Sequence, residues 1–178
     1  MHKGDAVTAT TQTAMTPAKG VAVLAAVAVG VAGYLVLSHA LGIVEAWAGF
    51  LFLLYWAGIE HMSIEKLPHC VVGALLGVVI ATLPRLLPDG LGDSKMLVFL
   101  GVIVVLVYCQ IMGWLPIAIN MMTMLYLTVG TIPWIQAKVD FAGMLSGALL
   151  GIGYFGGLLG GSLWLAQRRA TRVPATTE

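Results

Sequence analysis

The sequence predicts an all-helical membrane protein that crosses the bilayer about six times. Hydrophobic residues make up 60% of its 178 positions and charged residues only 10%, whereas soluble domains carry roughly 25% charged residues. The mean hydropathy is +0.97. The apolar residues also form long continuous stretches instead of alternating with polar ones, which favours membrane helices over a β-barrel.

The apolar stretches define six expected spans of roughly the 17 to 25 residues that a bilayer requires. In chain order they cover residues 20–37, 43–59, 69–87, 96–113, 115–134 and 141–166. The third is the least regular, because Pro84 and Arg85 interrupt it and Pro88 ends it. Without that span, five remain and the termini fall on opposite sides. Residues 20–166 thus form the expected transmembrane domain, between disordered cytosolic tails at 1–19 and 167–178.

Charged and aromatic residues favour an orientation with both termini in the cytoplasm. The cytoplasmic segments then hold Lys3, Lys19, Lys66, Arg168, Arg169 and Arg172, and the outer loops hold Arg85, Lys95 and Lys138. Six basic residues inside against three outside agree with the positive-inside rule. All five tryptophans fall near span ends, with Trp47 and Trp134 outside and Trp56, Trp114 and Trp164 inside. Interfacial anchoring explains these tryptophan positions.

Glycine recurs at four-residue intervals in two of the expected spans. The members are Gly73 and Gly77 in the third span, and Gly143, Gly147, Gly151, Gly157 and Gly161 in the sixth. Small residues let two helices approach closely, and glycine on more than one face allows more than one neighbour. We therefore predict tight helix packing and a homo-oligomer with span six, span three or both at its interface.

The link YWAGIEHMSIEKLPH, residues 55–69, gathers the charged and imidazole side chains between two spans. In a continuous helix His61, Glu65 and His69 would share one face and could ligate zinc. Pro68 disfavours the helical conformation of its predecessor and breaks that face. A solvated loop is the favoured interpretation, and no metal site is predicted. A gating or proton-sensing cluster of Glu60, His61, Glu65 and His69 is the alternative.

A few polar residues lie inside the expected spans and suggest a solute path. Glu45 lies two residues into span two, and Asn120, Thr123 and Thr131 lie on one stripe of span five, with Tyr126 pointing away. Such groups are costly against lipid, so they face either water or another helix. The alternatives are ordinary helix packing for the stripe and an outward-reaching interfacial carboxylate for Glu45.

Three segments carry a resemblance to a known family. They are LGIVEAWAGFLFLLYWAGI, CVVGALLGVVIATL and LLGIGYFGGLLGGSLWLAQRR. Across residues 40–169 the chain resembles the YcdZ-like family of small bacterial inner-membrane proteins of unknown function. The resemblance rests on apolar spacing, the Trp-Ala-Gly-Phe entry and the glycine-rich last helix. It implies a bacterial inner membrane location and supplies no chemistry.

A more distant similarity is to the fusaric-acid-resistance and aromatic-acid-exporter superfamily. Its members combine an aromatic helix, a short basic link and a helix with a basic residue before two glycines four apart. The corresponding parts here are residues 47–56, the link SIEKLPH, and Gly73 with Gly77. Cys70 stands where the basic residue is expected, and no large soluble domain accompanies the spans. This similarity implies transport of organic anions.

These observations predict a small transporter or channel for an organic solute, either an anion or a neutral molecule. The alternative is a structural or accessory subunit that packs against a larger membrane partner. Serine, histidine and aspartate form no readable catalytic motif, and deep paired carboxylates are absent, so we expect no enzyme. The lipid bilayer is the expected partner, without nucleic acid or cofactor. The substrate, direction and energy source are not readable from the sequence.

Overall fold

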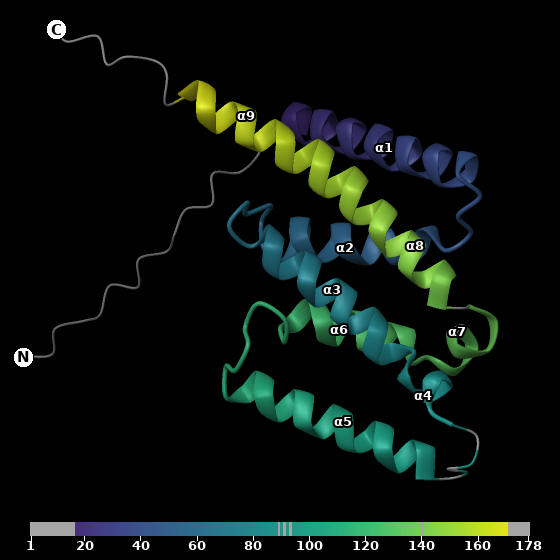
Figure 1. Ribbon diagram of the computed structural model, residues 1–178. Coiled ribbons are helices and arrows are strands. Elements are labelled where there is room, and N and C mark those ends of the chain that lie inside the picture. Colours follow the sequence, from purple (N-terminus) through teal and green to yellow (C-terminus); the bar gives the residue numbers. More distant parts are fainter. Residues whose placement is uncertain (1–16, 89, 91, 93, 140, 171–178) are drawn as a thin grey trace, which may run out of the picture.

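The computed structural model describes residues 17–88, 90, 92, 94–139 and 141–170, and within them every regular element is a helix (Figure 1). The elements are α1 (Pro17–Ala40), α2 (Ala46–Gly58), α3 (Leu67–Ala81), α4 (Leu83–Leu86), α5 (Ser94–Ile111), α6 (Met121–Gly130), α7 (Pro133–Lys138), α8 (Phe141–Gly151), the π-helix η2 (Ile152–Gly160) and α9 (Gly161–Ala170). The last three follow one another without a break. The predicted all-helical class is confirmed.

Three of the helical stretches are long and apolar enough to cross a membrane. They are Gly20–Ala40, Ser94–Ile111 and Phe141–Gly160. The apolar helices α2, α3 and α6 have only 13, 15 and 10 residues, fewer than the roughly 17 that a full crossing requires. Three helices with the length and apolar composition of a membrane span are therefore observed, and a sixfold crossing stays a prediction.

The expectation of one helix over residues 115–134 is wrong. Leu115 has a positive φ of 53°, and the chain makes turns until the side chain of Asn120 caps the first turn of α6. The helix ends at Gly130, and Pro133 then opens the separate helix α7. Proline lacks the amide hydrogen that an uninterrupted helix would need, so it is tolerated only at such a start.

The boundaries of the expected tails also change. Helix α1 begins at Pro17 and α9 continues to Ala170, so residues 17–19 and 167–170 belong to helices. The rest of the two expected tails, residues 1–16 and 171–178, lies outside the described residues. The helices extend past the points at which hydropathy alone falls.

The helices stack in layers, with their axes roughly aligned (Figure 1). Helix α3 packs most extensively against α6, and α2 packs most extensively against α8. These two pairs contain the core, where Phe52, Trp56, Met122 and Tyr126 are fully buried. Helices α1 and α5 lie at the two outer edges and bury only 6% and 11% of their most apolar windows. Their exposed apolar surface suits lipid contact.

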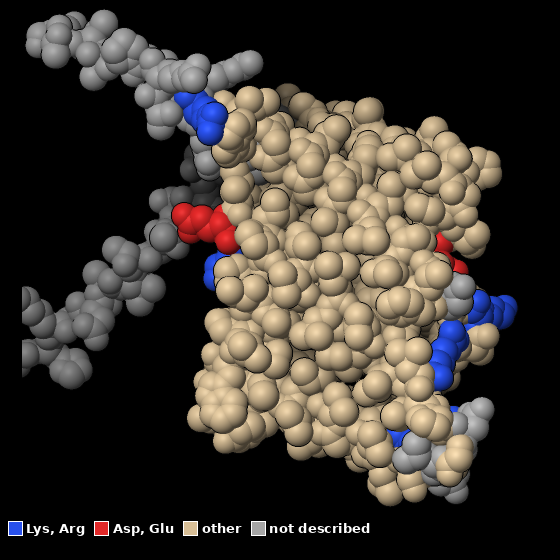
Figure 2. Space-filling view, viewed as in Figure 1, with Lys and Arg blue, Asp and Glu red and all other residues tan. Residues whose placement is uncertain are grey.

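Charged side chains are confined to the two ends of this helix stack on the face seen in Figure 2. The broad band between them is uncharged. An uncharged belt flanked by charges is the pattern that a bilayer imposes, because a charged side chain near the bilayer centre is costly.

The chain contains an internal repeat. The pentapeptide GALLG forms residues 73–77 of α3 and recurs as residues 147–151 of α8, 74 positions later. The same shift places Gly20 on Ser94, the first residue of α5, and Gly49 of α2 on Thr123 of α6. We therefore define two units: α1, α2 and α3 form the first, and α5, α6 and α8 form the second.

Helix packing obeys this repeat. The α3–α6 pair joins the third helix of the first unit to the second helix of the other, and the α2–α8 pair does the converse. A Cβ atom added to Gly77 would lie 2.7 Å from the Thr123 carbonyl oxygen, and one added to Gly151 would lie 2.9 Å from the Gly49 carbonyl oxygen. These two contacts correspond under the 74-residue shift. The units therefore join through the same close backbone approach made twice.

The two units run in opposite directions. The helices that make up the two units alternate in direction along the chain, and each unit contains three of them, so α1 begins at the left end of the stack in Figure 1 and α5 begins at the right end. The start of α1 and the end of α9 consequently lie at the same end. The protein is thus an inverted repeat.

The first testable prediction concerns the paired glycine contacts. Gly77→Ala and Gly151→Ala should each lower the free energy of unfolding by about 1–3 kcal/mol, the usual cost of overpacking, because the new methyl group meets backbone atoms of the other unit. Thermal unfolding in a mild detergent measures the effect.

Gly101→Ala in α5 is the matched control, since nothing lies within 4 Å of its added Cβ atom. It should leave stability unchanged or raise it, because alanine is the better helix former. Equal behaviour of all three variants would contradict close packing at Gly77 and Gly151.

Candidate functional site

A cavity of about 380 Å³ opens at the end of the stack where two links meet, residues 59–66 between α2 and α3 and residues 112–120 between α5 and α6. Its lining from the first unit comprises Tyr55, Glu60, Lys66, His69 and Cys70, and its lining from the second comprises Gln110, Gly113, Pro116, Ile119 and Asn120. Most of these side chains are polar. The cavity therefore lies between the inverted units.

The α2–α3 link is shaped by two left-handed residues. His61 and Met62 have φ values of 49° and 57°, which turn the chain sharply out of α2. The indole nitrogen of Trp56 donates to the Ser63 carbonyl oxygen at 2.9 Å, and this bond holds the link against α2. The Tyr55 hydroxyl donates to a carboxylate oxygen of Glu60 at 3.2 Å. Glu60 is thereby fixed at the cavity wall.

Asn120 connects the two units at this end. Its amide oxygen accepts hydrogen bonds from the backbone amides of Met122 and Thr123, at 3.0 and 3.3 Å, and so caps α6. Its amide nitrogen donates to the His69 carbonyl oxygen at 2.9 Å. The side chain fits because position 73 of α3 is glycine, where an added Cβ atom would collide with it. One asparagine thus starts α6 and ties it to the start of α3.

His69 carries an unusual buried group. Its Nδ1 atom is buried and has no hydrogen-bond partner within the described part of the chain. An unsatisfied buried polar atom costs about 1–3 kcal/mol, so a native protein normally supplies water or a ligand to it. His69 is also one of the residues that line the cavity.

The predicted cluster on the α2–α3 link is divided by the fold. Glu60 and His69 line the cavity, whereas His61 and Glu65 are exposed and do not. Among the described residues no three histidine, cysteine, aspartate or glutamate side chains are placed to hold a metal ion. The left-handed turn explains this division, because it destroys the helical face that the four-residue spacing would have required.

The four residues of the predicted solute path are not brought together. Asn120 lines the cavity, but Thr123 is fully buried and donates its hydroxyl to the Ala118 carbonyl oxygen. Thr131 donates to the Thr128 carbonyl oxygen at 3.0 Å. Glu45 lies at the opposite end of the stack, just before α2, where its carboxylate accepts a hydrogen bond from the indole of Trp47. Each of the four makes local bonds that stabilise helix ends or turns.

Tyr126, which was expected to point away from this stripe, lies in the core of the protein. Tyr126 is fully buried, and an added Cβ atom on Gly77 would lie 2.6 Å from the Tyr126 Cβ atom. Its hydroxyl donates to the Ala48 carbonyl oxygen of α2. Tyr126 therefore faces α3 beside Thr123, because the close approach at Gly77 brings this side of α6 against its neighbour.

Sequence reasoning did not assign Tyr55, Lys66, Cys70 or Gln110 to a site. The two GALLG segments were the available signal, since they identify the repeat and hence the two links that meet at one end. Cys70 and Gln110 come from different units. Only the packing of α3 on α6 brings them to one cavity.

The opposite end of the α3–α6 pair is covered by α7. The side-chain amide of Gln136 donates to the carbonyl oxygens of Ala81 and Gly130, both at 2.6 Å. The guanidinium of Arg85 donates to the carbonyl oxygen of Val139, just after α7. Under the 74-residue shift, residues 133–138 correspond to residues 59–64 of the α2–α3 link. Equivalent links therefore leave a cavity at one end and form a cover at the other.

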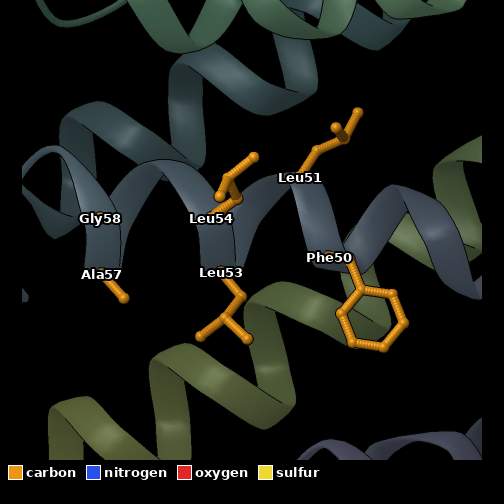
Figure 3. Close-up of a pocket in the computed structure, with 6 residues that line it drawn as sticks. All are labelled: Phe50, Leu51, Leu53, Leu54, Ala57 and Gly58. Carbon is orange, nitrogen blue, oxygen red and sulfur yellow. The ribbon is translucent and has the colours of Figure 1, made fainter.

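A larger hollow on α2 has a different character. It measures about 490 Å³ and is lined by Phe50, Leu51, Leu53, Leu54, Ala57 and Gly58 (Figure 3). Figure 3 shows their side chains leaving α2 on two sides, with Leu53 and Ala57 below the helix and Leu51 and Leu54 above it. No polar side chain lines it, so it fits a lipid chain better than a soluble molecule.

Comparisons of this chain with protein-family models, with curated proteins and with solved structures found no match. The two family resemblances therefore stay predictions, and function has to be inferred from the cavity and the repeat.

The second prediction concerns Asn120. Asn120→Ala should lower the free energy of unfolding by about 0.5–2 kcal/mol, because it removes the cap of α6 together with the hydrogen bond to His69. Asn120→Ser is the matched variant: serine caps a helix well but lacks the amide that reaches α3.

Thermal unfolding in detergent should therefore place the wild type highest in stability, the Asn120→Ser variant next and the Asn120→Ala variant lowest. If all three proteins unfold at the same temperature, the tie between α3 and α6 at this end does not stabilise the fold.

Proposed function

We propose that this chain is an integral membrane protein that moves a small polar organic solute across the bilayer and binds it in the cavity described above. The observation that carries the proposal is the placement of that cavity between two inverted three-helix units. Many secondary transporters are built from inverted repeats and bind their substrates at the repeat interface.

The chemistry of the lining supports a binding role. Ligand-binding pockets carry a small number of placed polar groups that orient the ligand. The cavity gathers Glu60, Lys66 and His69 in a chain of which only 10% is charged. Gln110 adds a side-chain amide to the same lining. Together these groups give a polar solute several points of attachment.

The balance of charge favours a solute without net charge. Glu60 and Lys66 carry opposite charges on the same cavity wall, so a molecule with a single charge would be attracted by one and repelled by the other. A zwitterion or an uncharged polar molecule meets both groups favourably. An organic anion, which the exporter resemblance implies, is the second candidate.

The membrane arrangement belongs to the same proposal. Six crossings place both termini in the cytoplasm of a bacterium, with the cavity on the cytoplasmic side of the inner membrane. The exposed apolar surfaces of α1 and α5 support contact with lipid. For a homo-oligomer, Gly157 and Gly161 are the suitable glycines because they have open space beside them, whereas Gly73, Gly77, Gly147 and Gly151 pack against their own chain.

The third prediction tests orientation. A phosphatase reporter fused at Ser94 should be active, because the start of α5 lies at the outer end, and a fluorescent-protein reporter fused at Glu178 should fluoresce in the cytoplasm. Fusions in which the two reporters are exchanged between these positions serve as the control. Phosphatase activity at Glu178 would contradict six crossings.

The fourth prediction tests transport. In proteoliposomes loaded by osmotic challenge, influx of glycine followed by light scattering should exceed that of empty liposomes, with glycerol and sodium acetate as the uncharged and anionic probes. Glu60→Gln and Lys66→Met should each lower glycine influx by about tenfold or more, because a lost hydrogen bond to a charged group costs about 1.5–3 kcal/mol.

Glu65→Gln is the matched control, since Glu65 belongs to the same link but is exposed outside the cavity. It should transport like the wild type. Influx at the level of empty liposomes for all three probes would reject transport of small solutes and favour the alternative of an accessory subunit.

A further inference from the structure

We infer that this protein is a carrier that opens its two ends in turn, and that α7 is the gate of the end that is closed here. The inference rests on the proposed transport function and specifies how it is performed. A channel would instead keep one continuous path open at both ends.

The first support is the equivalence of the packing surfaces. The α3–α6 and α2–α8 pairs place glycine against backbone at corresponding positions, Gly77 against Thr123 and Gly151 against Gly49. If each unit adopts the conformation now held by the other, the same kind of contact forms again in both pairs. Two states related in this way differ little in packing energy, which is the condition for both to be populated.

The second support is the difference between the two ends in this one state. Residues 59–66 leave a cavity between the units, whereas residues 133–138, the counterpart of most of that link, fold over the end as α7. In an inverted repeat, exchanging the conformations of the units exchanges the open and closed ends. The cavity end would close, and the end beneath α7 would open.

The third support is the way in which α7 is held. Gln136 donates to Ala81 of α3 and to Gly130 of α6, so a single side chain joins the two units at this end. Arg85 makes a second attachment, to the carbonyl oxygen of Val139. Ile132 and Val139, which flank α7, have non-helical backbone. A short helix with two polar attachments and non-helical flanks can move as a unit.

The opened end would present Glu45 to the solute. Glu45 lies directly before α2 and is half-buried at this end, next to Ala46, the counterpart of Asn120. Other counterparts differ in kind from the cavity lining, because Val129 corresponds to Tyr55 and Gly143 corresponds to His69. The second mouth is therefore not a duplicate of the first site.

Thiol accessibility tests the inference without any knowledge of the substrate. In full-length protein lacking Cys70 and Cys109, Gln110→Cys reports on the open cavity and Ala81→Cys reports on the space beneath α7. A water-soluble maleimide should label position 110, which is partly exposed at the cavity wall, and spare position 81, since Ala81 is fully buried. Elution volume on size exclusion verifies that each variant is folded.

Loosening α7 should change the labelling rates at positions 81 and 110 in opposite directions. Gln136→Leu removes both hydrogen bonds that this side chain makes and should raise the labelling rate at position 81 by about tenfold or more while lowering that at position 110. Arg85→Met should act in the same direction and replaces the first variant if that one fails to fold. Lys138→Met is the control, because Lys138 lies on α7 over the ring of Trp134, and it should change neither rate.

Each outcome supports or overturns the inference. Opposite changes at the two positions support alternation, whereas a rise at position 81 with no fall at position 110 shows that α7 is an independent cover. Unchanged labelling in both the Gln136→Leu and the Arg85→Met variant overturns the role of α7 as a gate. Because no solute flux is measured, alternation without influx of glycine, glycerol or acetate would reject the proposed transport of small solutes while the movement of α7 stands, and influx without alternation would reject the carrier mechanism alone.

Discussion

The close backbone contact between helices of opposite units is the constraint on which the rest of this structure depends. Inside a membrane, helices gain little from burying apolar surface, so van der Waals contact at small residues has to hold them together. Gly49 meets Gly151, and Gly77 meets the backbone of Thr123. These two crossings fix the positions of α2, α3, α6 and α8, and all other elements are arranged around that four-helix centre.

The positions of the links follow from these crossings. Because α3 and α6 run side by side, their starts meet at one end and their last carbonyl groups meet at the other. An amide side chain spans the pair at each end: Asn120 reaches His69 at the first, and Gln136 reaches Ala81 and Gly130 at the second. The polar cavity thus lies at one end of the α3–α6 pair, and α7 covers the other end.

The repeat also shows how far equivalent sequence leads to equivalent structure. Tyr34 and Tyr108 are counterparts under the 74-residue shift, yet Tyr34 is fully buried and Tyr108 is 52% exposed. The hydroxyl of Tyr34 donates to the Ala46 carbonyl oxygen, beside the glycine crossing of α2 and α8. Tyr108 instead packs edge-on against Trp114 at the stack's edge. The central helices obey the repeat closely, and the outer helices α1 and α5 do not.

The sequence by itself determined the all-helical class, the approximate position of every long apolar helix and the importance of glycine packing, because hydropathy and residue size are local properties. The duplicated GALLG pentapeptide would also have disclosed the repeat. Only the tertiary structure decided that span five is interrupted, that Glu60 and His69 share a cavity while His61 and Glu65 do not, and that Thr123 is buried. These depend on left-handed turns and on contacts between helices far apart in the sequence, which no local pattern encodes.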